Sequence, residues 1–186
     1  MEIIKVENGY LSNNYILIND DSAIIIDCSL KLDTLKQILN GKKLCACIIT
    51  HGHFDHFYSL GDIVSYYNCD VYMHERAFSK LSNATDNASE VFNMPFTLDL
   101  SKEKIKFIKD KDILNLLDTE FEIYEAFGHT DDSVLIKCGN NVFTGDFVFE
   151  QGYGRTDLST GSFQMFKKYL KKHLKLLQSS NLFYGH

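Results

Sequence analysis

The stretch from Thr50 to His56 reads T-H-G-H-F-D-H and directly follows an apolar run. It holds three of the seven histidines in the chain. In extended backbone, residues i and i+2 point the same way, so His51 and His53 can reach one metal ion together. Asp55 and His56 fall at the start of the next expected helix and can serve a second ion. Imidazole and carboxylate ligands suit zinc, and also iron or manganese.

Two ions need more ligands, and the chain offers three further candidates at similar boundaries. His129 lies in G-H-T, Asp146 in T-G-D and His186 in Y-G-H. Each is a metal-capable side chain beside a glycine, placed just after an apolar strand. Glycine lets the backbone turn sharply and come close to a site. The pattern therefore indicates a metal centre built from several strand ends.

Composition and charge narrow the class of protein. The chain has 186 residues, 45% of them hydrophobic and 24% charged, and we expect one globular domain over residues 1–186. A net charge of -6 argues against nucleic acid as a partner. No apolar stretch is long enough to span a bilayer, and the first residues lack signal-peptide features. We therefore expect no membrane partner and a cytoplasmic location, with the five cysteines as free core residues.

Periodicity predicts alternating strands and helices in two halves, which favours packed sheets with helices outside. The segment 83–104 is a long polar loop, either a lid over the site or a plain surface connection. We expect Cys45 and Cys47 to share one face of their strand. Strands are predicted at 15–19, 23–27, 44–50, 71–73, 121–126, 133–137 and 142–144, and helices at 32–39, 55–67, 75–81 and 162–177.

The ligand motifs, in this order and spacing, resemble those of the metallo-β-lactamase fold superfamily over nearly the whole chain. The stretches 145–149 (G-D-F-V-F) and 154–158 (G-R-T-D-L) are similar to the glyoxalase II branch, the hydroxyacylglutathione hydrolases. The opening at Asn14-Tyr15 and the I-I-D that ends at Asp27 also fit this branch. The chain resembles a short form, without the C-terminal helical domain that helps full-length members bind glutathione.

The resemblance implies an α/β (α+β) fold, a four-layer αββα sandwich with a binuclear site at one edge. The first metal would be held by His51, His53 and His129, and the second by Asp55, His56 and His186. Asp146 would bridge the two ions. Asp27 would orient a ligand histidine from behind. His74 and His173 match no ligand motif and are expected to be structural or surface residues.

The activity implied by the resemblance is hydrolysis of a thioester or related acyl compound by metal-bound hydroxide, with two zinc ions as the expected cofactor and iron or manganese as alternatives. Asp55 would orient the hydroxide as well as bind metal. Tyr153 and Arg155 are candidates for substrate contact, although Arg155 could equally be an ion-pair partner. After His129 the chain carries Asp131-Asp132, where this branch often has proline and glycine, and the resemblance does not explain these two carboxylates.

Other functions of the same scaffold remain open. A mononuclear iron persulfide dioxygenase would use part of this ligand set and leave the second site idle. The tRNA-processing branch generally has a longer chain with a basic exosite, while lactonases and β-lactamases are other acyl hydrolases of the fold. The alternative to an enzyme is a metal-binding domain with little or no turnover. Complete retention of Asp55, His56 and His186 favours two metals.

Overall fold

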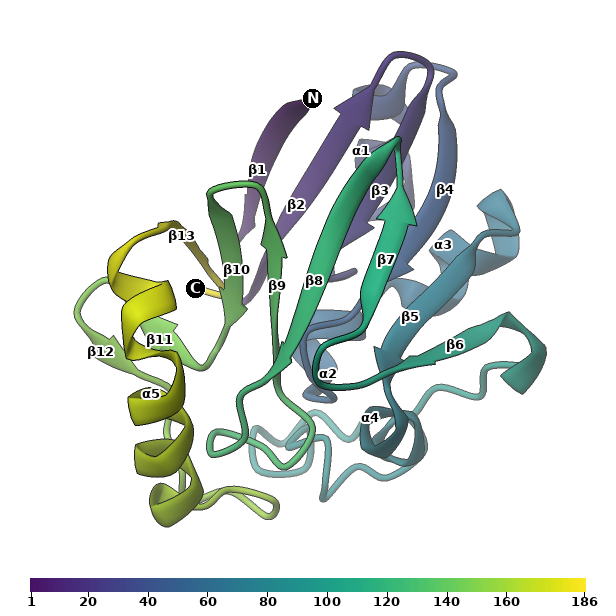
Figure 1. Ribbon diagram of the computed structural model, residues 1–186. Helices are drawn as coiled ribbons and strands as arrows, with labels where there is room; N and C mark the ends of the chain where they lie inside the picture. The colour runs from purple at the N-terminus through teal and green to yellow at the C-terminus, as the bar shows by residue number, and fades with distance from the viewer.

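The computed structural model describes residues 1–186 (Figure 1). Along the chain, the strands and helices are β1 (Glu2–Asn8), β2 (Leu11–Asn19), β3 (Ser22–Ile26), α1 (Leu32–Leu39), β4 (Lys43–Ile48), α2 (Phe54–Phe57), α3 (Leu60–Tyr67), β5 (Asp70–His74), α4 (Glu75–Lys80), a 3-10 turn (Lys102–Lys104), β6 (Ile105–Ile108), β7 (Ile113–Leu116), β8 (Thr119–Glu125), β9 (Val134–Cys138), β10 (Asn141–Gly145), β11 (Val148–Phe149), β12 (Gly152–Tyr153), α5 (Phe163–Gln178) and β13 (Asn181–Tyr184).

Two mixed sheets form the centre of the molecule. The first has the strand order β1-β2-β3-β4-β5-β6, with antiparallel pairing up to β3 and parallel pairing from β3 onward. The second has the order β13-β10-β9-β8-β7 and is antiparallel except where β13 runs parallel to β10. A small ribbon of β11 and β12 stands apart. Each sheet is therefore built largely from one half of the chain.

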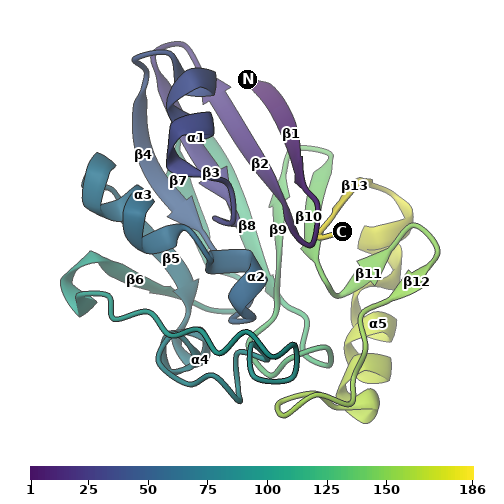
Figure 2. The same cartoon turned by 180° about the vertical axis from the view of Figure 1, so that it is seen from behind.

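Three hydrophobic layers show how these elements stack. One layer joins the first sheet to helices α1 and α3, with Ile25 and Leu35 among its members. A second layer lies between the sheets and includes Ile24 and Phe121. A third joins the second sheet to α5 and includes Val142 and Phe166. Helices α1 and α3 lie behind the first sheet in Figure 1 and in front of it in Figure 2, and α5 lies on the outer side of the second sheet. The predicted αββα sandwich is confirmed.

The helix predicted over residues 55–67 is wrong as one element, because it divides into α2 and α3. The backbone of Cys28 intervenes at the break. Its N–H donates to the carbonyl of His56 at 2.7 Å, and its carbonyl accepts the N–H of Ser59 at 2.8 Å. The Ser12 hydroxyl donates to the carbonyl of Asp55 at 3.0 Å. These tertiary bonds use the groups that a continuous helix would pair internally.

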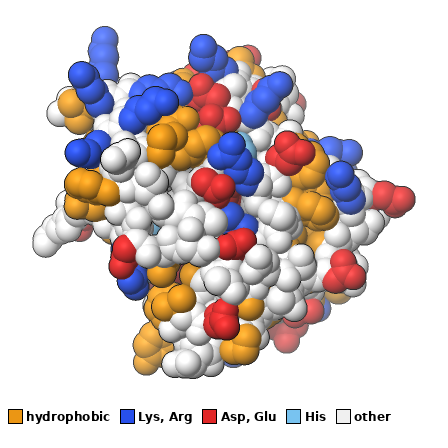
Figure 3. Space-filling model, turned by 90° about the horizontal axis from the view of Figure 1, so that it is seen from below, with side chains coloured by type: hydrophobic (Ala, Val, Ile, Leu, Met, Phe, Trp, Pro, Cys, Tyr) orange, Lys and Arg blue, Asp and Glu red, His pale blue; other side chains and the backbone are white.

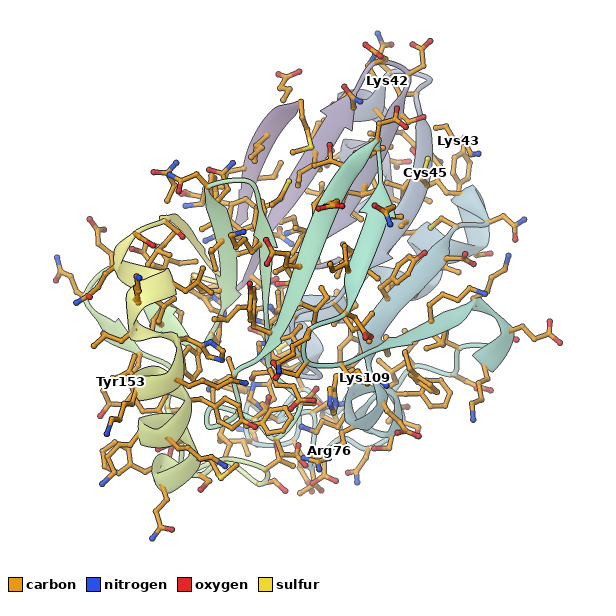
Figure 4. The ribbon with its side chains drawn as sticks, viewed as in Figure 1. Lys42, Lys43, Cys45, Arg76, Lys109 and Tyr153 are labelled. Atoms are coloured by element: carbon orange, nitrogen blue, oxygen red, sulfur yellow. The ribbon has the colours of Figure 1, made fainter.

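Strand β4 also departs from the expected pattern, since Cys45 and Cys47 do not share a face. The pairing of β3 with β4 shifts register between Ala23 and Ile24, which places a bulge at Cys45. Cys47 consequently packs between the sheet and the helices, whereas Cys45 packs against the layer between the sheets. Figure 4 shows Cys45 near Lys42 and Lys43, at the upper end of the molecule. All five cysteines are free, as expected.

None of the helices has both the length and the apolar character required to cross a membrane.

Candidate metal centre

Seven side chains from five segments meet at one edge of the sandwich. His51 and His53 follow β4, and Asp55 and His56 lie in the short helix α2. The other three follow strand β8, β10 or β13: His129 lies in the loop after β8, Asp146 comes directly after β10, and His186 follows β13 with Gly185 between them. The structure brings together every residue that the sequence motifs nominated as a metal ligand.

The ligand atoms fall into two groups that share a wall. His51, His53 and His129 offer ring nitrogens that all lie within 4.8 Å of one another, with 2.9 Å between His129 Nε2 and His53 Nδ1. The second group is Asp55, His56 and His186. Here Asp55 Oδ2 is 3.1 Å from His186 Nε2 and 3.8 Å from His56 Nε2. The arrangement matches two adjacent cation sites.

Asp146 lies between the two groups. Its Oδ1 is 3.3 Å from His56 Nε2, on the side of the second group. Its Oδ2 is 3.6 Å from His129 Nε2 and 3.5 Å from His186 Nε2. One carboxylate therefore faces ligands of both groups, which is the position that a bridging ligand requires.

Three buried polar atoms in this cluster have no hydrogen-bond partner: His51 Nε2, His56 Nε2 and Asp146 Oδ1. An unpaired polar atom in the interior costs about 1–3 kcal/mol, and more when it is charged. All three atoms point into the region where the ligand groups meet. A divalent cation would satisfy them, so the residues present fit a bound metal.

Contacts behind the ligands fix which nitrogen of each ring is free. His129 Nδ1 lies 2.7 Å from the carbonyl oxygen of Arg155, which can only accept, so Nδ1 carries the proton. His56 Nδ1 lies 2.8 Å from Asp27 Oδ2 and donates to that carboxylate. In both rings the Nε2 lone pair is left for a metal.

Asp27 is held in place by the residue that precedes the first ligand. Its Oδ1 accepts the backbone N–H of Thr50 at 2.9 Å, and its Oδ2 accepts the Thr50 hydroxyl at 2.9 Å. Asp27 itself adopts a left-handed backbone with a φ of 58°, an uncommon conformation that aspartate tolerates better than most residues. Its carboxylate thus ties His56 to the strand end that carries His51.

The charge state of the site follows from burial and from its carboxylates. Burial, together with the neighbouring imidazoles, holds the pKa of His51 and of His53 well below the usual histidine range. Both rings are therefore neutral ligands at neutral pH. At His56 burial lowers the pKa, but Asp27, Asp146 and Asp55 outweigh it and raise the pKa well above normal. The three carboxylates around His56 therefore favour a positive charge in this half of the site.

Two glycines make the close packing possible. A Cβ on Gly185 would lie 2.1 Å from Asp146 Oδ1. A Cβ on Gly154 would lie 2.0 Å from the carbonyl oxygen of Asp146 and 2.7 Å from His129 Nδ1. Any side chain at either position would displace a ligand. Steric crowding therefore explains why a glycine precedes His186.

The segment that carries His186 is attached to strand β2. The backbone N–H of Asn13 donates to the carbonyl of Gly185 at 2.7 Å, and the Asn13 amide donates to the carbonyl of Tyr184 at 3.0 Å. The Tyr15 hydroxyl donates to the same Tyr184 carbonyl at 2.6 Å. The first and second sheets are therefore joined at the last ligand. The motifs gave no sign of this role for Asn13.

A buried ion pair lies beside the first ligand group, and sequence reasoning missed its lysine. Lys80 is only 3% exposed, and its ammonium contacts Asp132 and, at 2.7 Å, Asp131. Asp132 in turn accepts the backbone N–H of Gly52 at 2.7 Å, between His51 and His53. The two carboxylates after His129 were the available signal, because carboxylates in such a place need a cation.

Of the two residues expected to contact substrate, Arg155 lines the cavity over the ligand groups and Tyr153 does not. The Arg155 guanidinium, however, is bound in two places to Asp157, both at 2.8 Å. The Tyr153 ring stacks on Phe166 with 4.4 Å between the ring centroids and does not line that cavity. Figure 4 shows Tyr153 on the outer side, beside α5.

The other two histidines lie outside the ligand groups. His74 caps helix α4, where its Nδ1 accepts the N–H of Arg76 at 3.2 Å. His173 in α5 donates from Nε2 to the carbonyl of Glu125 at 2.7 Å. Burial lowers the pKa of His173. Both contacts are structural.

The cavity above the ligands has a volume of about 370 Å³. His53, Asp55, His129, Asp146 and His186 all reach its wall. The metal-facing atoms are thus accessible to a small molecule from one side of the molecule.

Comparison with known proteins gives consistent matches. The profile of the metallo-beta-lactamase superfamily matches residues 8–186. A relative from Bacillus subtilis named "Probable metallo-hydrolase" is 31% identical over 156 residues, which cover 81% of this chain and 72% of that protein. A hydroxyacylglutathione hydrolase from Buchnera aphidicola is 31% identical over 158 residues, covering 82% of this chain but 54% of that protein. The crystal structure of the BLEG-1 B3 metallo-beta-lactamase superposes with a TM-score of 0.87 at 26% identity, covering 100% of this chain and 91% of that one.

Proposed function

This chain belongs to the metallo-β-lactamase superfamily, and we propose that it is a hydrolase with two zinc ions that cleaves a thioester or a related acyl compound. The observation that carries the proposal is the completeness of the second ligand group. Asp55, His56 and His186 converge beside the histidine triad, and Asp146 faces both groups. A mononuclear site would have no use for this second set.

The nature of the ligands favours zinc. Five of the seven are imidazoles and two are carboxylates, a mixture that suits zinc and is less suited to magnesium or calcium. Ions bound here would supply Lewis acidity, which acidifies water and polarises a carbonyl group. Iron and manganese accept the same ligands and are alternatives that an elemental analysis decides.

The chain's own residues divide the remaining work. Asp55 contacts His186 through Oδ2, and its side chain is 17% exposed at the cavity wall, so it can accept a hydrogen bond from an attacking water and orient it. Asp27 keeps the proton of His56 on Nδ1, and the carbonyl of Arg155 does the same for His129. These contacts hold the ligand rings rigid while charge develops on the substrate.

The choice of a thioester rests on chemistry and on one relative. A thiolate is a good leaving group with high affinity for zinc. The relative named hydroxyacylglutathione hydrolase acts on a thioester by its name, and it supports this choice without identifying the thiol. The partner is therefore proposed to be a small acyl compound rather than a nucleic acid.

The test combines metal content with turnover. Protein purified without added metal should contain close to two ions per chain, with zinc prominent, and should cleave at least one of a panel of glutathione, coenzyme A and small-thiol thioesters. Asp55→Asn should lose most of the activity, whereas Asp33→Asn, an exposed aspartate in α1, should retain it. Failure to cleave any thioester would overturn the proposal.

The same measurements address the competing functions. One iron per chain, with oxygen uptake on a glutathione persulfide, would favour the dioxygenase alternative. Bound metal with no turnover on any acyl substrate would favour a metal-binding role. A β-lactam belongs in the panel because the structural neighbour reported above is named a metallo-beta-lactamase.

A further inference from the structure

A second cavity, of about 430 Å³, opens beside the metal cavity. Six of its eight lining residues are hydrophobic: Tyr10, Leu11, Phe54, Tyr58, Phe92 and Met94. Asp55, Tyr10 and Phe92 line both cavities. A group attached to a carbonyl at the metal centre can therefore extend into this apolar space, which we call the side pocket.

The side pocket is built from segments on both sides of the metal centre. Tyr10 lies in the turn between β1 and β2, Leu11 begins β2, and Phe54 begins helix α2. Phe92 and Met94 come from the long loop between α4 and β6, at the lower end of the molecule in Figure 1. The Phe54 and Phe92 rings meet with 6.0 Å between centroids across the pocket.

Several of these side chains remain largely in solvent. Tyr10 is 101% exposed, Phe92 55% and Met94 50%. Seen from below, the surface carries several separate hydrophobic patches between charged side chains (Figure 3). Exposed apolar side chains gathered at a cavity mark an interaction site, such as a ligand-binding groove. Folding alone gives no reason to gather them here.

Hydrogen bonds hold the loop that presents Phe92 and Met94. The Asn87 amide, fully buried, donates to the carbonyl of Phe96 at 2.9 Å, and the carbonyl of Asn87 accepts the N–H of Phe54 at 2.9 Å. The hydroxyl of Ser89, also fully buried, accepts the N–H of Phe96 at 2.9 Å. The backbone of the loop that carries these side chains is thus held in place, which lowers the entropy lost when a ligand binds.

The side pocket offers no partner for an anionic group. Neither cavity has a free cationic side chain, because Arg155 is the one lysine or arginine on their walls and Asp157 binds its guanidinium. In the side pocket, the two polar residues are Asp55 and Asn8, and the Asn8 amide already donates to the carbonyl of Ser29 at 2.7 Å. A carboxylate or phosphate in the side pocket would have no lysine or arginine to pair with.

We propose that the side pocket receives the acyl group of the substrate, and that this group is a neutral, medium-chain aliphatic or arylalkyl chain. The inference rests on the proposed function, since it places the reacting carbonyl at the metal centre. Phe92 and Met94 then determine specificity. A short acyl group would leave the side pocket unfilled. A charged acyl group would lack an ion-pair partner there.

The kinetic test varies the acyl group on one neutral thiol. N-acetylcysteamine thioesters of acetyl, butyryl, hexanoyl and octanoyl groups should show kcat/KM rising by about fourfold per methylene until the pocket is full. Phe92→Ala and Met94→Ala should flatten this rise. Ile113→Ala, an equally exposed (55%) hydrophobic residue on β7, should leave it unchanged. A flat series, or a rise that Phe92→Ala and Met94→Ala leave unchanged, would overturn the inference while the hydrolase proposal stands.

A binding measurement does not depend on turnover. N-methylalkanamides of the same chain lengths are neutral and resist cleavage. In a spectrum of the four methionine methyl groups, the Met94 signal should shift on titration while that of Met73, fully buried in the core, should not. The Kd should fall with each methylene. An unshifted Met94 signal, or a Kd independent of chain length, contradicts the inference even if no thioester is hydrolysed.

Discussion

Lys80 is almost completely buried, and its ammonium contacts Asp132, whose other oxygen accepts the N–H of Gly52 between two metal-facing histidines. Thr160 accepts a third contact from Lys80 at 2.9 Å. The pair therefore joins helix α4 and the loop after β8 to the backbone that positions His51 and His53.

Removing the lysine should destabilise the fold. Lys80→Met leaves the buried Asp132 without its cation, and breaking a buried pair typically costs about 3–5 kcal/mol. Denaturant unfolding should show a loss of this size, and Lys171→Met on the solvent side of α5 should show almost none. The double variant Lys80→Met/Asp132→Asn should lose less than the two single losses combined, because the residues are coupled. Additive losses would mean that the pair is not a unit.

Asp27→Asn should weaken one ion more than the other. The asparagine still reaches His56 but no longer offers a carboxylate to its Nδ1–H, which lies 2.8 Å from Asp27 Oδ2. Loss of such a contact behind a ligand usually lowers metal affinity by about 10- to 100-fold. Titration of metal-free protein with zinc should show a loss of this size for the second ion. Equal weakening of both ions would contradict the assignment of His56 to the second group.

Asn13→Ala should act on the same ion from the other side. The variant loses the hydrogen bond from the Asn13 amide to the carbonyl of Tyr184, which is worth about 1 kcal/mol. The segment of His186 then becomes less ordered, and we expect binding of the second ion to weaken by about fivefold. Asn181→Ala is a matched control. Asn181 lies at the exposed start of β13, the strand that leads to His186, and its amide donates to the side chain of Asn141 on β10. An equal effect of both variants would remove the special role of Asn13.

His173 should make stability depend on pH. Burial lowers its folded-state pKa below the unfolded value of about 6.5, so the unfolded chain binds more protons in acid. The free energy of unfolding should therefore fall as the pH drops below about 6.5 and level off below the folded pKa. His173→Gln should fall less over this window than the wild type. Since both proteins share all metal ligands, identical pH profiles would contradict the prediction.

The metal centre could be predicted from sequence because its ligands lie in short motifs next to glycine. The network behind it could not. Lys80 gives no pattern of its own, since its burial depends on a carboxylate 52 residues further along the chain, that of Asp132. Asn13 looks like an ordinary polar residue near a strand until the segment of His186 is placed against it.

The fold divides in the same way. Alternating hydrophobic patterns predicted the central strands, and the helix expected over residues 162–177 is present as α5. Strands β6 and β7 were missed because they are short and lie at the edges of their sheets, where only alternate or terminal residues are covered. The break between α2 and α3 depends on the backbone of Cys28, and the bulge at Cys45 depends on its pairing with β3. Neither contact leaves a local trace.

The ligands come from both sheets, and this has a consequence for how the chain unfolds. An ion held between residues as distant along the chain as Asp55 and His186 would act as a reversible cross-link that closes a very long loop. Loop closure of this kind removes entropy from the unfolded chain, in the same manner as a disulfide. Metal availability would then set how often the two halves separate, so a chelator should lower the unfolding temperature of the whole sandwich rather than loosen one edge of it.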